Sequence, residues 1–508
     1  MELNIKNDSL KVSSLVCCRK NDFTAECDVI VPDTKPDIAR VLLVSARTMV
    51  TGCETQSDRV ILSGTVFFNI LYLADNEEQS VKSIDTSAAF SNIFNSSDIR
   101  AGMLTLSDVD VSEVKCDVAN CRKLSVKATL TGSIRVYSSY DIELLTDIDC
   151  ACVKKSELCS TVVGAHSEII QSFSESFEIP QTKSAASEIL KCDASISGVD
   201  TKIIDDKAII KGTLCVTVLY DGDGRPDYIS FEMPFAQVID AEGLRSDMSV
   251  HPKVCLYDIN TALAQNDAGE MRTLNINASL FFRILAMQTV KKSFITDAYV
   301  PHSGLDVKKS PVTVTGIENT ADSEVSFCET LTLPDSFSPI DTVYRVIARP
   351  VCERCEISDS KLNVSGYTEV YLLYISSDSL SPVFSYKKDV DFNCSFENSD
   401  CTLTPGAECS LKSLSYVISG ERSVEVRGCI EIHTECTRET ETDVIYNAEP
   451  APPEPQNRAS VIISFLSEGQ RLWDIAKEYN ISPEDILKAN GAEEESSLMP
   501  GAALIIPR

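Results

Sequence analysis

The chain has 508 residues, of which 43% are hydrophobic and 24% are charged, as in ordinary soluble globular proteins. Its 46 basic and 76 acidic residues give a net charge of −30. Such a field repels nucleic-acid phosphates and anionic lipid headgroups, so the charge argues against binding to either. The length allows three or four domains.

The beginning of the chain lacks a charged-then-apolar signal pattern, and no run of 18 apolar residues occurs in it. We therefore expect a cytoplasmic protein without membrane insertion. Many of the 20 cysteines stand at apolar strand positions, as Cys215 and Cys429 do. Cysteine behaves there as a small hydrophobe, so we expect mostly reduced structural thiols, with later cross-linking left open.

A segment that begins with glycine and ends with tyrosine occurs three times, at starts 148 and 154 residues apart. The copies are Gly64–Tyr72, Gly212–Tyr220 and Gly366–Tyr374. Two other residue types keep the same step, namely Pro32, Pro180 and Pro334, and Arg122, Arg272 and Arg422. A repeat of about 150 residues has the size of an ordinary domain. A tandem of three such modules is more typical of a scaffold than of a catalyst.

Strand patterns dominate residues 1–447, with clear alternation of apolar and polar residues at 60–66, 274–278 and 423–427. Asp221–Gly224 predicts a hairpin turn, because glycine tolerates the positive φ that such turns need. Short helical turns are expected after the prolines, at 36–40 and 184–190. We therefore predict a mainly β protein with three sandwich-like or barrel-like modules, at 1–152, 153–304 and 305–447.

A change of composition follows, because residues 448–455 contain four prolines. Residues 448–459 are predicted to be an extended linker, and 460–508 to be a separate βααβ domain. Leu472, Ile475, Ala476 and Tyr479 lie on one face of its first helix. Ser482 and Pro483 begin the second helix, Asn490 and Gly491 end it, and strands are expected at 460–465 and 503–507.

This last segment resembles a LysM domain, a family that binds glycans containing N-acetylglucosamine. The matching residues are Gly469, 472–476, Tyr479, Asn480, Ile486, Leu487, Asn490, Pro500, Gly501 and 504–507. Gln470 and Arg471 stand where the family has Asp-Thr at the border of its sugar groove, and the arginine favours a protein partner. The resemblance implies a partner- or glycan-binding site at Gly469, Gln470, Arg471, Leu472, Trp473, Met499, Pro500 and Gly501.

The three repeats resemble the SPOCS domain of clostridial spore-coat assembly proteins, through Val31–Ile38 and the three glycine-to-tyrosine segments. The second module has Ser184 and Ala185 in place of the Pro-Asp pair of the first. Three such modules before a LysM domain are similar to the SipL-like coat-assembly family. That resemblance implies docking through LysM to a coat-basement ATPase resembling stage IV sporulation protein A, in the mother cell at the forespore surface.

The other candidate sites give weaker signals. Asp221, Asp223 and Glu232 are spaced like calcium ligands, but Arg225 and Pro226 break the loop. Cys352 and Cys355 have a zinc or redox spacing with no second pair, and we interpret them as structural thiols. The four histidines, which are His166, His251, His302 and His433, are scattered and predict neither a metal cluster nor a Ser-His-Asp arrangement. No P-loop motif occurs.

Trp473, the single tryptophan, is open to two interpretations, core packing or a half-exposed binding anchor. The leading hypothesis is a non-enzymatic adaptor in spore-coat assembly, with no catalytic, cofactor or metal site. The alternative is a cell-wall protein that binds peptidoglycan through N-acetylglucosamine. A cell-wall hydrolase with an unrecognised catalytic β-domain is the least favoured class.

Overall fold

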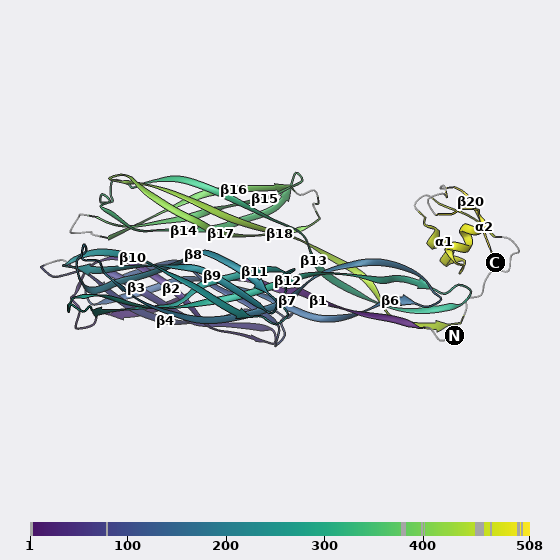
Figure 1. The fold of residues 1–508 in the computed structure, drawn as a ribbon, viewed down its shortest axis with the longest axis horizontal. Helices are drawn as coiled ribbons and strands as arrows, with labels where there is room; N and C mark the ends of the chain where they lie inside the picture. The colour runs from purple at the N-terminus through teal and green to yellow at the C-terminus, as the bar shows by residue number, and fades with distance from the viewer. Residues whose placement is uncertain are drawn as a thin grey trace.

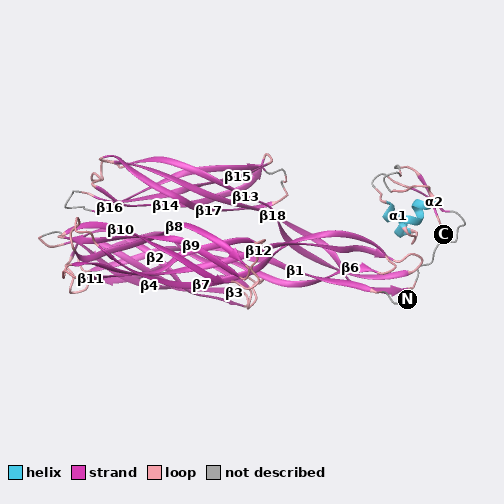
Figure 2. Ribbon diagram, viewed as in Figure 1, coloured by secondary structure: helices cyan, strands magenta, loops and turns pink. Residues whose placement is uncertain are grey.

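The computed structural model describes residues 4–77, 80–376, 383–397, 400, 402–452, 462–467, 470–494, 498 and 501–507. Within these residues the protein consists mainly of long antiparallel strands, with two short helices near the C-terminus (Figure 2). The prediction of a mainly β protein with a small helical domain at its end is confirmed.

Each module contains six strands. The first has β1 (Ile5–Ile30), β2 (Ile38–Gln56), β3 (Arg59–Ala74), β4 (Val81–Asn95), β5 (Leu104–Asn120) and β6 (Lys123–Ile148). The second has β7 (Cys152–Glu178), β8 (Ala186–Ile204), β9 (Lys207–Gly222), β10 (Arg225–Asp240), β11 (Ser249–Gln265) and β12 (Met271–Tyr299). The third has β13 (Gly304–Thr332), β14 (Thr342–Ser358), β15 (Lys361–Ile375), β16 (Val383–Glu397), β17 (Thr404–Gly420) and β18 (Ser423–Ala451).

Every module is a sandwich of two three-stranded sheets. In the first, the sheet orders are β1-β6-β5 and β2-β3-β4, and the other two modules repeat this topology. The first strand of each module therefore pairs with its last. Alternate residues of the central strands point inward, as Val60, Leu62, Val66 and Phe68 do in β3, so the period-two pattern of the sequence builds the core between the sheets.

The repeated glycine and tyrosine serve the packing of each sandwich. A Cβ on Gly64 would lie 2.5 Å from the ring of Phe90, and one on Gly212 would lie 2.6 Å from that of Phe235, so only glycine leaves room for the aromatic ring. Tyr72 and Tyr374 are fully buried, and each hydroxyl donates to a main-chain carbonyl of the loop before the second strand. The repeat thus marks structural positions.

The repeated proline and arginine meet in each module, although they lie about 90 residues apart. Arg272 donates to the carbonyls of Pro180 (3.0 Å) and Lys183 (2.8 Å). Arg422 and Arg122 make the same type of contact with the loops that begin at Pro334 and Pro32. The arginine therefore fixes the loop that joins the two sheets, by satisfying carbonyls that strand pairing leaves free.

The predicted helical turns after these prolines are wrong. Residues 33–35 form a turn and Ile38 already begins β2, whereas residues 186–190 belong to β8. Ala186 pairs with Gly222 of β9, and Leu190 is buried. Pairing with an adjacent strand outweighs the local helical preference of this alanine- and serine-rich segment.

The first and last strands of each module continue beyond the sandwiches, and their ends join in one bundle (Figure 1). We call this bundle the stalk. Its core takes side chains from all six strands β1, β6, β7, β12, β13 and β18: Leu10, Val12, Leu144, Leu158, Phe294, Val312, Val314 and Val444. Since equivalent positions of the three repeats pack against one another, the modules associate around an approximate threefold axis. Strand β18 runs to Ala451, four residues into the segment predicted as a linker, where Ala448 is buried.

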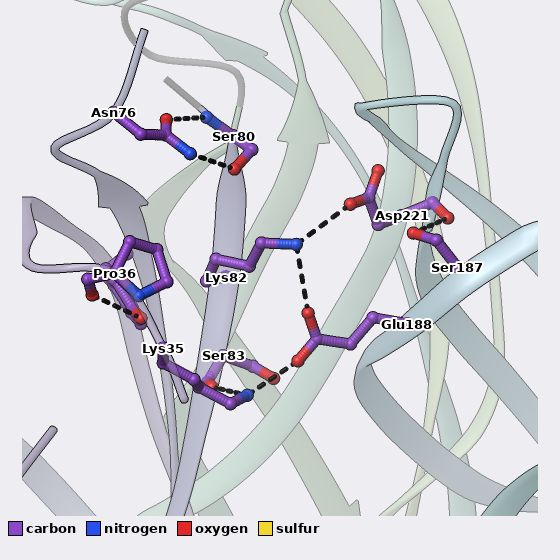
Figure 3. A network of polar contacts seen from close by, with 10 residues as sticks. Lys35, Pro36, Asn76, Ser80, Lys82, Ser83, Ser187, Glu188 and Asp221 are labelled. Atoms are coloured by element: carbon purple, nitrogen blue, oxygen red, sulfur yellow. Dashed lines mark hydrogen bonds and ion pairs between the residues drawn. The ribbon is translucent and has the colours of Figure 1, made fainter. Parts of the chain in front are cut away.

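The sandwiches themselves also touch. Leu71, Leu219 and Leu373 occupy the same position in the three repeats and share one apolar cluster. Beside this cluster, Glu188 of the second module forms ion pairs with Lys35 (2.7 Å) and Lys82 (3.2 Å) of the first (Figure 3). A further ion pair, between Arg283 and Asp108, joins the same two modules, and one between Arg135 and Glu408 joins the first module to the third. The three modules therefore pack against one another through their sandwiches as well as through the stalk.

Candidate functional site

The C-terminal domain has the predicted order of elements: β19 (Ile462–Phe465), α1 (Leu472–Glu478), α2 (Pro483–Ala489) and β20 (Ala503–Ile506). Ser482 caps α2, because its hydroxyl accepts from the Asp485 amide, and Asn490 ends that helix. Leu472, Ile475, Ala476 and Ile486 are buried between the helices and the two-stranded sheet. The sequence patterns for both helices are confirmed.

The residues predicted as its binding site have different environments. Gly469, Met499 and Pro500 lie outside the described residues. Leu472 is buried in the domain core, whereas Arg471 and Gly501 are exposed and Gln470 is half-buried. Gly501 has a φ of 86°, and its amide donates to the Leu466 carbonyl. The described part of the site is therefore a polar edge beside the start of α1.

Trp473 contacts the stalk. Its ring packs edge-on against Tyr299 of β12, with centroids 5.1 Å apart, and its Nε1 donates to Asp297 (3.3 Å). Lys477, one turn further along α1, forms an ion pair of 2.6 Å with the same carboxylate. Trp473 is also half-buried against the core of its own domain, as the core-packing interpretation predicted. Neither interpretation predicted that its side chain anchors the domain to another part of the chain.

Main-chain contacts complete this attachment. The Tyr299 hydroxyl donates to the Ile481 carbonyl (2.8 Å), and the amide of His302 donates to the Asn480 carbonyl (3.0 Å). The Asn480 side-chain amide in turn donates to the Ser303 carbonyl (3.0 Å). The end of β12 and the turn after it therefore hold the segment between α1 and α2, and the domain is fixed to the stalk.

Asp297 is the centre of the charged contacts in this attachment. Burial raises the pKa of its carboxyl, but the hydrogen bond and charge of Lys477 outweigh burial, so the net pKa lies below the usual value. A depressed pKa means that the attachment gains its full stabilisation above the ordinary aspartate pKa of about 4. It loses that stabilisation as the pH falls through the depressed value.

We therefore expect acid to release the C-terminal domain. Because Trp473 is the only tryptophan, its emission should shift to the red as the pH falls below about 4, when the ring becomes hydrated. Asp297→Asn should show a partly shifted emission at neutral pH and little further change with acid. Far-ultraviolet circular dichroism separates this step from unfolding of the sheets. An identical acid midpoint in both proteins would contradict the role given to Asp297.

A second feature of the domain is the uncovered face of its small sheet. Ile463 and Ile505 are cross-strand partners that are 55% and 48% exposed, and Phe465 is 64% exposed. The opposite face covers the helices. Exposed apolar side chains that lie together on one face indicate a surface for a partner. The only trace of this face in the sequence is the alternation of residues in two short strands.

The other candidates of the sequence analysis fall elsewhere. Asp223 and Gly224 have φ values of 56° and 82°, so the predicted hairpin turn is confirmed, and Asp221 bonds to Lys82. Cys352 and Cys355 lie in β14, where burial raises the pKa of the Cys355 thiol to about 11, as for an unreactive structural thiol. No disulfide joins the cysteines that the structure describes.

The prediction that all four histidines are scattered is wrong for two of them. They were expected to be dispersed, with no metal cluster, but His251 and His433 lie together with Glu435 between two modules. The two histidines come from different repeats and from positions that are not equivalent. Comparing the three repeats in the sequence therefore could not predict that these two histidines are close in space.

Taken together, the fold is that of a tandem β-sandwich protein with a small βααβ binding domain. The chain matches two family models: "SipL, SPOCS domain" over 37–119, 185–264 and 339–419, and "LysM domain" over 467–507. No curated protein and no solved structure matches it. The chain thus has the SipL-like architecture, in which tandem SPOCS domains precede a C-terminal LysM domain.

The three SPOCS matches cover β2–β5, β8–β11 and β14–β17, and so leave out the six strands of the stalk. SPOCS and LysM domains are binding domains and not catalytic ones, and their combination fits a spore-related or cell-wall-binding protein. In the described part of the chain, neither helix is long and apolar enough to cross a membrane.

Proposed function

We propose that the protein is a non-enzymatic adaptor in assembly of the spore envelope. In this proposal it works in the mother-cell cytoplasm at the forespore surface. Its LysM domain docks there to a coat-basement morphogenetic ATPase that resembles stage IV sporulation protein A, while the SPOCS modules hold other coat components. The SipL-like architecture supports this assignment.

One observation carries the choice of a protein partner over a glycan. The LysM domain exposes Ile463, Phe465 and Ile505, whereas its only tryptophan already packs against the stalk. A neutral sugar is usually held by an accessible aromatic ring together with hydrogen-bonding side chains, whereas the neighbours of Phe465 on this face, Ile463 and Ile505, are aliphatic. An exposed aliphatic and phenyl face suits another protein, because burying it removes apolar area from water.

The packing of the three modules against one another supports the adaptor role. Because the three sandwiches are joined by the stalk and by ion pairs, they present several surfaces at fixed relative positions. The LysM domain is attached at the end of the stalk, away from the sandwiches (Figure 1). A partner that polymerises would then multiply a modest LysM contact through avidity.

Co-purification from sporulating cells tests the docking. We expect the full-length chain to retain the ATPase, and a chain lacking residues 460–508 to lose it. The double variant Phe465→Ser/Ile505→Ser should lose most of it while the domain stays folded. Val417→Ser is the matched control, since Val417 is equally exposed (59%) but lies in the third module. Equal recovery of the ATPase with all four proteins would exclude docking through LysM.

Peptidoglycan binding is the second candidate, because the LysM match spans 467–507 and includes Arg471, Trp473 and Gly501. Sedimentation with purified cell wall distinguishes the two functions. Strong sedimentation that is lost with Trp473→Ala but kept with Phe465→Ser/Ile505→Ser would favour the glycan. No sedimentation of the wild-type chain would leave the protein partner as the ligand of the domain.

A further inference from the structure

His251, His433 and Glu435 lie together at the junction of the modules. His251 is on β11 of the second module, and the other two are on β18 of the third. His433 and Glu435 are two residues apart in one strand, so their side chains point to the same face. Arg135 and Tyr137 of the first module line the adjacent cavity, which has a volume of about 240 Å³.

The donor atoms of the three side chains converge on one point. Oε1 of Glu435 lies 3.3 Å from Nε2 of His251 and 3.4 Å from Nε2 of His433. A tetrahedral zinc ion with bonds of about 2.0–2.1 Å places its ligand atoms about 3.3–3.4 Å apart. All three donor atoms lie within 4.8 Å of one another, so small side-chain rotations would complete the triangle.

A neighbouring carboxylate prepares His433 for such a role. Asp322 stands opposite His433 in the paired strand β13, and its Oδ1 lies 2.5 Å from Nδ1 of the ring. Nδ1 therefore carries the proton, and the lone pair of the neutral ring is on Nε2, toward Glu435. A carboxylate bonded to the outer nitrogen of a histidine is the usual support of a zinc ligand, because it orients the ring and makes it more basic.

The charges around the cluster also favour a cation. Glu435 and Asp322 provide two negative charges, whereas the charge of Glu408 on β17 is balanced by an arginine. Arg135 lines the same cavity, but it forms an ion pair with Glu408 at 2.9 Å. Imidazole and carboxylate are ligands that zinc accepts, and two histidines with one glutamate form a known zinc set with an open fourth position.

We propose that His251, His433 and Glu435 bind one zinc ion between the second and third modules, with a water from the cavity as fourth ligand. The site is independent of the LysM domain and of the proposed partner. Zinc would link β11 to β18 and so hold two sandwiches together. Without metal the same side chains form a polar cluster, in which the histidine nitrogens lie 3.3 and 3.4 Å from the Glu435 carboxylate.

Metal titration of the full-length chain tests the site. Purified protein is stripped with a chelator and titrated at pH 8 with zinc chloride in a calorimeter, then with cobalt chloride in a spectrophotometer. We expect one zinc per chain and a cobalt spectrum of tetrahedral nitrogen and oxygen ligands without thiolate bands. Zinc should also raise the melting temperature, because it binds the folded state.

Variants separate this site from other metal ligands. His433→Ala and Glu435→Gln should weaken zinc binding at least a hundredfold, and Asp322→Asn should weaken it about 10–100-fold. His166→Gln is the matched control, because this histidine lies in the second module outside the cluster and should leave binding unchanged. Thiolate bands in the wild-type spectrum, unchanged binding in Glu435→Gln, or no zinc binding at all would each overturn the proposal. The cobalt spectrum of the wild type decides even if a variant does not fold.

Discussion

Gly366→Ala should lower the free energy of unfolding by about 3 kcal/mol or more, the upper end of the effect of overpacking in a core. Gly366 lies in the central strand β15. An added Cβ would come far closer than 3.0 Å to the Val351 carbonyl oxygen. It would also lie 3.1 Å from the ring of Phe392. A backbone oxygen in a paired strand cannot rotate away, so the sheet itself must shift. Urea unfolding followed by circular dichroism measures the loss.

The three repeats should differ in a defined order. Gly64→Ala should match Gly366→Ala, because its Cβ also meets a backbone oxygen at too short a distance, that of Met49. Gly212→Ala should cost less, since its nearest backbone oxygen lies 3.3 Å away and the main conflict is with the end of the Phe235 ring. Gly406→Ala is the control, with its nearest atom at 3.7 Å. A loss for Gly406→Ala equal to that for Gly366→Ala would refute this explanation.

The steric need for these glycines explains why the sandwiches could be predicted from the sequence. A position that only glycine can occupy, next to an aromatic ring, must reappear in each copy of the fold. Glycine and tyrosine therefore mark the central strands in all three modules, and the alternation in segments such as 60–66 follows from burial of one strand face. The caps of α2 were equally readable, because Ser482 and Asn490 act within a few residues of their partners.

The arrangement of the modules could not be predicted in this way. The stalk is built from the outer ends of the long strands, which look like any other strand in the sequence, and its contacts join residues about 150 positions apart. The position of Trp473 depends on Asp297 and Tyr299, which belong to another module. His251 and His433 are brought together only by the association of two modules. Contacts between domains leave no local period in a sequence.

Arg272→Ala should lower the free energy of unfolding by about 3 kcal/mol. The Arg272 side chain is 9% exposed, and its guanidinium donates to the carbonyls of Pro180 and Lys183 and to Glu270 (2.6 Å). Hydrogen bonds from a charged donor contribute about 1.5–3 kcal/mol each, and their loss leaves buried carbonyls without partners. Thermal and urea unfolding measure the change. Arg272→Lys should recover only part of it, because the single lysine nitrogen cannot reach the carbonyls and the Glu270 carboxylate at once, as Nη1 and Nε of the arginine do.

The same substitution in the first module tests whether burial sets the size of the effect. Arg122 makes similar contacts with the loop at Pro32, but its side chain is 35% exposed, so water can replace the lost hydrogen bonds. Arg122→Ala should therefore cost clearly less than Arg272→Ala. Arg245→Ala, at an exposed site of the second module, should be nearly neutral. If Arg122→Ala proved as damaging as Arg272→Ala, the loop contact itself, and not its burial, would determine the stability of the sandwich.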